Sequence, residues 1–186
     1  MIKTVRDAWK IPELRKKILF TIFALLIFRL GAAIPVPYIN SQELEVYLAA
    51  QSGTILGLMT AMSGSAFSMA TLFALSIQPY INSSIIIQLL TIAIPSLGRM
   101  AQEGGEEGKK KIQSITRYAT VAIAILQAIG YYFMMKNYNL LEQDGIWVAL
   151  VIIVTLIAGS SFVMWMGEQV LSLIHISEPT RHLRIS

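Results

Sequence analysis

Four long apolar runs dominate this sequence, and they constrain its fold more than any other feature. The runs cover residues 18–34, 71–95, 117–135 and 145–167. Each is close to the roughly 20 residues that a helix needs to cross a hydrocarbon layer of about 30 Å. Lipid offers no hydrogen-bond partner to backbone amides, and the runs are longer than barrel strands, so only α-helices suit them. The sequence therefore predicts an all-α, polytopic bundle of transmembrane helices.

The composition agrees with a membrane protein and offers no catalytic chemistry. Charged residues make up 14% and hydrophobic residues 55% of the 186 residues, whereas a soluble domain carries about 25% charged residues. The chain has no cysteine, which excludes disulfides and thiolate metal sites. No pair of carboxylates, Ser/His/Asp set or metal-binding cluster stands out. We therefore expect neither enzyme activity nor a metal or other cofactor.

The positions of the basic residues predict the topology. Six Lys and Arg residues precede the first apolar run, and five lie between residues 98 and 117. Because the positive-inside rule places such clusters in the cytoplasm, we expect the N-terminus and the 98–116 loop on the inside. The segments 35–70 and 136–144 should then lie outside.

The start of the chain permits two interpretations. Residues 1–17 mix apolar and basic side chains, which is typical of an amphipathic segment lying on the cytoplasmic face of the membrane. A basic start followed by an apolar stretch also resembles a signal peptide. Arg29 interrupts that stretch, however, and three further runs follow. These features favour an uncleaved first helix over residues 18–34.

The second apolar run is far more polar than the fourth. It holds eight Ser, Thr, Asn and Gln residues in 25, against three in 23 in the fourth run. Polar groups inside a membrane must contact protein or water rather than lipid. The second run therefore fits either a buried helix that hydrogen-bonds its neighbours or a helix that lines an aqueous passage.

The segment 56–69 is apolar but too short to span a membrane, and it is rich in Gly, Ser and Met. A short helix that re-enters the membrane must be buried in protein or line a cavity, and Met packs adaptably. The segment is a candidate for a movable element that plugs a pore, with a surface loop as the alternative.

Several motifs in a fixed order resemble a known family. They cover residues 11–20, 73–91, 103–113 and 167–169, and read IPELRKKILF, FALSIQPYINSSIIIQLLT, EGGEEGKKKIQ and GEQ. Together they resemble bacterial SecY, the pore subunit of the Sec protein translocase. The resemblance runs from residue 1 to about 170. It implies a ten-helix channel, of which this chain would supply the first four helices and a short re-entrant plug helix.

The resemblance also implies roles for individual residues. Ile81 and Ile85 match the pore ring, and their i, i+4 spacing places them on one helix face. Bulky aliphatic side chains at a constriction exclude water and ions, which makes a hydrophobic gate; ordinary core packing is the alternative. Gln88 and Thr91 match the polar cluster of the lateral gate. The plug candidates within 56–69 are Leu56, Gly57, Met59, Met62, Ser63, Gly64 and Phe67.

By the same resemblance, we expect a channel that secretes unfolded polypeptides across the bacterial cytoplasmic membrane and inserts membrane proteins into it. The expected partners are SecE, SecG, the motor ATPase SecA, translating ribosomes and the lipid bilayer, with signal sequences and nascent polypeptides as substrates and no direct binding of nucleic acid. These four helices alone are not expected to function. A small-solute transporter is the alternative, but such proteins place charged or coordinating groups at the midplane. The second run offers Ile81, Ile85 and neutral amides there.

The end of the chain does not fit this pattern. Beyond Val170 the family continues into a fifth helix with a different sequence, whereas residues 171–181 read LSLIHISEPTR. That peptide is also the in-frame translation of a transposase adapter used in DNA library preparation. We therefore expect residues 171–186 to be a non-native tail.

Resequencing of the genomic locus tests this expectation. The codons after Val170 should encode a different peptide, because the adapter enters only during library preparation. Genomic DNA that encodes residues 171–186 ahead of a stop codon would contradict it.

Overall fold

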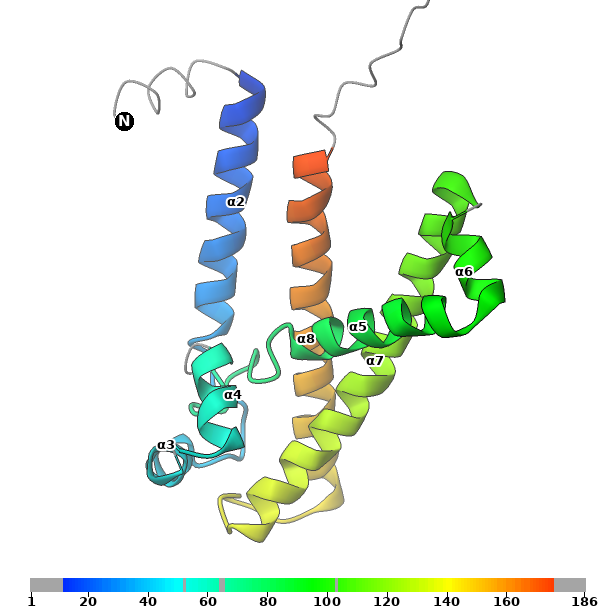
Figure 1. Cartoon of the computed structure of the whole chain (residues 1–186). Coiled ribbons are helices and arrows are strands. Elements are labelled where there is room, and N and C mark those ends of the chain that lie inside the picture. Colours follow the sequence, from blue (N-terminus) through cyan, green and yellow to red (C-terminus); the bar gives the residue numbers. More distant parts are fainter. Residues whose placement is uncertain (1–11, 52, 64–65, 103, 176–186) are drawn as a thin grey trace, which may run out of the picture.

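The structure is a computed structural model, and it describes residues 12–51, 53–63, 66–102 and 104–175. Within these ranges the chain forms seven α-helices and no strand (Figure 1). The prediction of an all-α membrane protein is confirmed. Residues 1–11 of the expected interfacial segment 1–17 lie outside the described residues, and residues 12–17 form the start of helix α2 (Pro12–Gly31).

Three long helices form the frame of the molecule. They are α2 (Pro12–Gly31), α7 (Gly105–Asn137) and α8 (Ile146–His175). In Figure 1, α2 and α8 run side by side, and α7 crosses α8 obliquely. Of the described helices, α7 and α8 are each long and apolar enough to cross a membrane. Helix α2 covers most of the expected first span, but five of its 20 residues are charged.

The expected second span, 71–95, is divided in the structure. Helix α5 (Gln78–Ala93) is followed by α6 (Pro95–Gln102), and the two are bent by 104° relative to each other. Proline explains both ends of α5. Pro79 suits the first helical turn, whereas Pro95 has no N–H and disfavours helical geometry at the residue before it.

The length and direction of α5 also differ from a simple span. Its 16 residues extend about 24 Å, less than the hydrocarbon thickness of about 30 Å. Figure 1 shows α5 lying across the direction of α2 and α8 rather than parallel to them. Helices α5 and α6 are long enough to cross a membrane only as a bent pair.

The expected 98–116 loop is largely helical. Helices α6 and α7 form a tight hairpin, and the φ angle of Gly105 at its turn is +54°, a conformation that glycine adopts without strain. Gly108 allows the two helices to approach, since a Cβ there would lie 2.0 Å from the carbonyl oxygen of Met100. The expected third and fourth spans, 117–135 and 145–167, lie within α7 and α8.

Two short helices, α3 (Ser41–Ala50) and α4 (Ile55–Ser63), lie at one end of the frame. Asn40 caps α3, because its side chain accepts a hydrogen bond from the backbone N–H of Glu43 at 3.3 Å. The Tyr47 and Tyr138 rings lie 4.3 Å apart, and the hydrogen bond between the two side chains raises the pKa of Tyr47.

The main hydrophobic core is at this same end. Side chains from α3, from the segment after α4 and from the adjoining ends of α7 and α8 meet there; they include Leu44, Phe67, Met135, Ile152 and Leu156.

Residues 66–77 cross the molecule as irregular backbone, and most of their side chains are buried. The N–H of Leu72 donates to the carbonyl of Ile34 at 2.9 Å, and the carbonyl of Ala70 accepts from the N–H of Val36 at 2.8 Å. Irregular backbone is tolerated at membrane depth only where protein or water satisfies it. Gly159 of α8 makes room for it, since a Cβ there would lie 1.9 Å from the carbonyl oxygen of Leu72.

We expect Gly159→Ala to destabilise the chain by about 1–3 kcal/mol, the usual cost of overpacking, because α8 would have to move away from residues 66–77. Gly130→Ala is the matched control. A Cβ at Gly130 meets nothing within 4 Å, and alanine favours a helix over glycine. Thermal unfolding in detergent should give a lower Tm for Gly159→Ala alone. Equal Tm values for the two variants would contradict the packing described.

Candidate functional site

Helix α5 has one face buried against α7. Pro79, Ser83 and Ile87 form that face. The Ser83 hydroxyl, which is fully buried, donates to the carbonyl of Thr116 at 2.9 Å and lies 2.9 Å from the hydroxyl of Thr120. At this position the second apolar run therefore behaves as a buried helix that hydrogen-bonds its neighbour.

Ile81 and Ile85 lie on the other side of α5. At about 100° per residue, each is about 160° around the helix from Ser83, and the two are about 40° apart. Their side chains are 40% and 50% exposed. The structure thus brings both isoleucines to one face and leaves them outside the main hydrophobic core.

Gln88 and Thr91 lie on a third side of α5, in a groove between α5, α6 and α7. The groove has a volume of about 330 Å³. The Thr91 hydroxyl donates to the backbone carbonyl of Gln88 at 2.6 Å. The polar residues that line the groove are Tyr80, Ser84, Gln88, Thr91, Lys109, Gln113 and Thr116. The two predicted lateral-gate residues are therefore neighbours in a polar environment.

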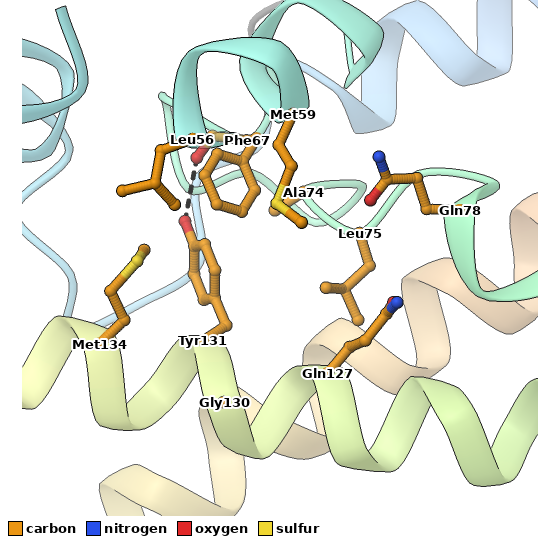
Figure 2. A pocket seen from close by; sticks show the side chains of 10 residues that line it. All are labelled: Leu56, Met59, Phe67, Ala74, Leu75, Gln78, Gln127, Gly130, Tyr131 and Met134. Carbon is orange, nitrogen blue, oxygen red and sulfur yellow. Dashed lines mark hydrogen bonds between the residues drawn. The ribbon is translucent and has the colours of Figure 1, made fainter. Parts of the chain in front are cut away.

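The predicted plug segment forms α4 and the turns after it. Leu56, Met59 and Phe67 line a cavity of about 200 Å³ that also contacts α7 (Figure 2). Met62 accepts a weak hydrogen bond from the Gln78 amide, with 3.6 Å between sulfur and nitrogen. Gln78 is the first residue of α5, so this contact joins the predicted plug segment to the helix that carries Ile81 and Ile85.

The remaining plug candidates are placed as follows. Gly57 is half-buried within α4. Ser63, which ends α4, donates to the carbonyl of Thr60 at 3.2 Å and accepts from the N–H of Phe67 at 3.2 Å. Gly64 lies outside the described residues.

Two residues of α7 that the sequence analysis missed complete the cavity. Tyr131 donates to the carbonyl of Phe67 at 3.0 Å, and the two rings pack edge to face at 5.0 Å. Gln127 extends toward the cavity that Gln78 also lines (Figure 2). The buried Oε1 atom of Gln127 has no hydrogen-bond partner among the described residues. Their i, i+4 spacing in an apolar run was the available signal, since polar residues there need a partner.

Comparison with known proteins identifies the family. The family model for SecY matches residues 71–173, which is more than half of the chain. The curated relatives named protein translocase subunit SecY include three from well-separated bacteria. The relative from Aquifex aeolicus is 38% identical over 176 residues, which cover 91% of this chain. The relative from Escherichia coli strain K12 is 43% identical over 162 residues, which cover 85% of this chain. The relative from Bacillus subtilis is 37% identical over 176 residues, which cover 92% of this chain.

The match extends over nearly all of this chain but over less than half of each relative. The chain spans 41% of the Aquifex aeolicus protein, 36% of the Escherichia coli protein and 40% of the Bacillus subtilis protein. Three of the four motifs that carry the resemblance, at residues 73–91, 103–113 and 167–169, lie within the residues that the family model matches. With its membrane-type helices and this match, the chain belongs to the SecY family.

Proposed function

We propose that this chain forms the first helices of a protein-conducting channel subunit. Unfolded polypeptides would cross the bacterial cytoplasmic membrane through the channel, and membrane segments would leave it sideways into lipid. The observation that carries the proposal is the position of Ile81 and Ile85, which share the face of α5 opposite its contact with α7. Membership of a family whose curated relatives are named translocase subunits favours this function over small-solute transport.

The packing of α5 supports a pore-ring role for the two isoleucines. Ser83 is buried and bonded to α7, which sets the rotation of α5 about its own axis. Ile81 and Ile85 are therefore directed away from α7. A ring of such side chains would exclude water and ions from the idle channel and still yield to a polypeptide.

The contacts of α4 support a plug role for the segment 56–69. The cavity beside α4 leaves part of its surface unpacked, and its link to α5 is a single weak bond from Gln78 to Met62. The firmer attachment is the bond from Tyr131 to Phe67. Phe67 lies in the hydrophobic core and anchors the end of the segment, so α4 is the part that can move aside when a polypeptide enters.

The groove beside Gln88 and Thr91 supports a lateral-gate role for these two residues. It lies between α5 and α7, and most of the residues that line it carry a polar group in the side chain. A signal sequence that passes from the pore into lipid would cross such a seam, where neutral polar groups can exchange partners with its backbone and with water.

The curated relatives are subunits by name, which supports a multi-subunit complex. We propose SecE, SecG, SecA and the ribosome as partners, and signal sequences and nascent polypeptides as substrates. The N-terminus and the α6–α7 hairpin, which carry most of the basic residues, would face the cytoplasm. The channel would need further helices beyond those described here.

A full-length subunit that carries residues 1–170 of this chain allows a test of the pore ring. We expect the double variant Ile81→Gly, Ile85→Gly to raise ion conductance through the idle channel at least several-fold in planar bilayers, because the apolar constriction is lost. Ile86→Gly is the matched control, since this side chain is 45% exposed on a different face of the same helix. Unchanged conductance in the double variant would count against the gate role.

Tyr131→Phe tests whether the hydrogen bond from Tyr131 to Phe67 holds the segment 56–69 in its closed position. It removes one of two donors to the carbonyl of Phe67, which also accepts from the N–H of Ala70 at 3.3 Å. The loss costs about 0.5–1.5 kcal/mol, so the plug segment should leave its closed position roughly two- to tenfold more often. Because the chain has no native cysteine, maleimide labelling of Leu56→Cys reports this directly. Tyr132→Phe is the control, since it removes the same hydroxyl from the next residue of α7, whereas the bond to the carbonyl of Phe67 comes from Tyr131. Equal labelling rates in the two variants would refute the role of Tyr131.

A further inference from the structure

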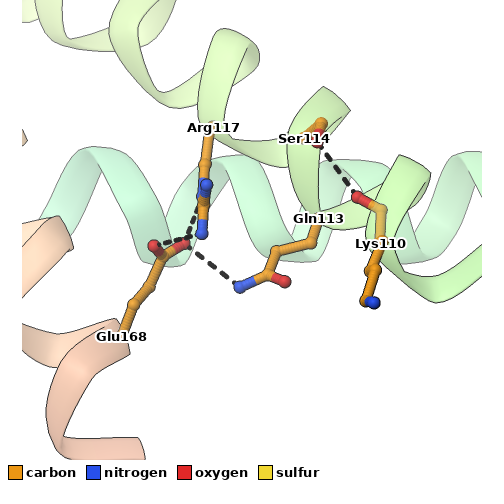
Figure 3. A network of polar contacts seen from close by, with 5 residues as sticks. All are labelled: Lys110, Gln113, Ser114, Arg117 and Glu168. Carbon is orange, nitrogen blue, oxygen red and sulfur yellow. Dashed lines mark hydrogen bonds and ion pairs between the residues drawn. The ribbon is translucent and has the colours of Figure 1, made fainter. Parts of the chain in front are cut away.

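Glu168, near the end of α8, joins that helix to α7 (Figure 3). Its side chain is only 9% exposed. Arg117 donates from Nε to Oε1 at 2.8 Å, and its Nη2 lies 2.7 Å from Oε2. Gln113 adds a longer bond from its amide to Oε1 at 3.4 Å. This two-point geometry fixes the direction as well as the distance between the groups.

The same turn of α7 also holds α5. Thr116 directly precedes Arg117, and its carbonyl oxygen accepts the hydrogen bond from Ser83. One turn of α7 therefore contacts α8 through Arg117 and α5 through Thr116.

We propose that Arg117 and Glu168 are positioning residues that keep Ile81 and Ile85 in the closed arrangement of the idle channel. This inference rests on the proposed function. With the pair intact, α8 holds α7, and α7 holds α5 through Ser83. Without it, the nearly buried carboxylate of Glu168 loses its main partner, and α7 shifts to bring the group to water. Helix α5 then moves with α7, and the side chains of Ile81 and Ile85 no longer point toward the pore axis.

A second ion pair shows why this one is suited to the role. Lys136, in the last turn of α7, lies 3.8 Å from Asp144, and the two side chains are 49% and 71% exposed. Exposed pairs of this kind contribute little, because water and salt screen them. Arg117 is also 49% exposed, but Glu168 is only 9% exposed and is bound at two points, so loss of the carboxylate's charge has a larger structural effect.

The test uses a full-length subunit that carries residues 1–170 of this chain, reconstituted in lipid. Spin labels at Leu89→Cys on α5 and Val154→Cys on α8 occupy exposed positions. Residues 1–170 contain no cysteine, and any cysteine in the rest of the subunit is replaced by serine, so that the distance distribution is specific to the two labels. Idle conductance is recorded in planar bilayers with unlabelled protein. The variants are Glu168→Gln, Arg117→Lys and the reversed pair Arg117→Glu with Glu168→Arg. Asp144→Asn is the matched control.

We expect Glu168→Gln to shift the label distance and to raise idle conductance at least fivefold. Arg117→Lys, which keeps the charge but loses the two-point geometry, should do the same to a smaller degree. If Glu168→Gln does not fold, Arg117→Lys is compared with the parent protein in its place. The reversed pair should return both quantities toward the parent values, and Asp144→Asn should change neither.

Parent-like distances and conductance in both Glu168→Gln and Arg117→Lys would overturn the inference. If Ile81→Gly with Ile85→Gly still leaks in that case, the proposed function stands and only the positioning role fails. If the isoleucine variant does not leak, the pore-ring role fails. A distance shift in Glu168→Gln would then still support Arg117 and Glu168 as the pair that positions α5.

Discussion

The hydrogen bonds between Ser83 and α7 are the interaction on which the candidate site depends. In lipid, apolar side chains gain little by facing protein, so hydrophobicity alone does not set the rotation of a helix about its axis. A buried hydroxyl does, because it must find a partner. Ser83 finds the carbonyl of Thr116 and the hydroxyl of Thr120, and this contact directs Ile81 and Ile85 to the opposite side.

The same demand for paired backbone groups explains the irregular segment 66–77. It departs from a helix, yet its amides and carbonyls bond to the turn after α2, and Gly159 lets α8 approach its backbone. Ala70 and Ser76 have positive φ angles of 47° and 50°, which cost energy in residues other than glycine. The link between α4 and α5 is thus held by its surroundings rather than by its own preference.

Charge shows the limits of sequence reasoning most clearly. The clustering of Lys and Arg is visible in the sequence and predicts which segments face the cytoplasm. Arg117 belonged to one such cluster and Glu168 to a matched motif, but nothing in either pattern paired them. They are 51 positions apart, and only the crossing of α7 over α8 brings them together. Gln127 and Tyr131 were missed for the same reason, since their importance comes from the cavity beside α4.

The sequence by itself determined the helical class, the apolar runs behind α7 and α8, the family, and the shared face of Ile81 and Ile85. These follow from local properties: hydropathy, charge clustering, motif order and the helical repeat. Only the tertiary structure decided that the second run is divided, that α5 lies across α2 and α8, and that Ser83 faces α7. Those features depend on the proline residues that end helices at particular places, and on contacts between residues far apart in the chain, which no local pattern encodes.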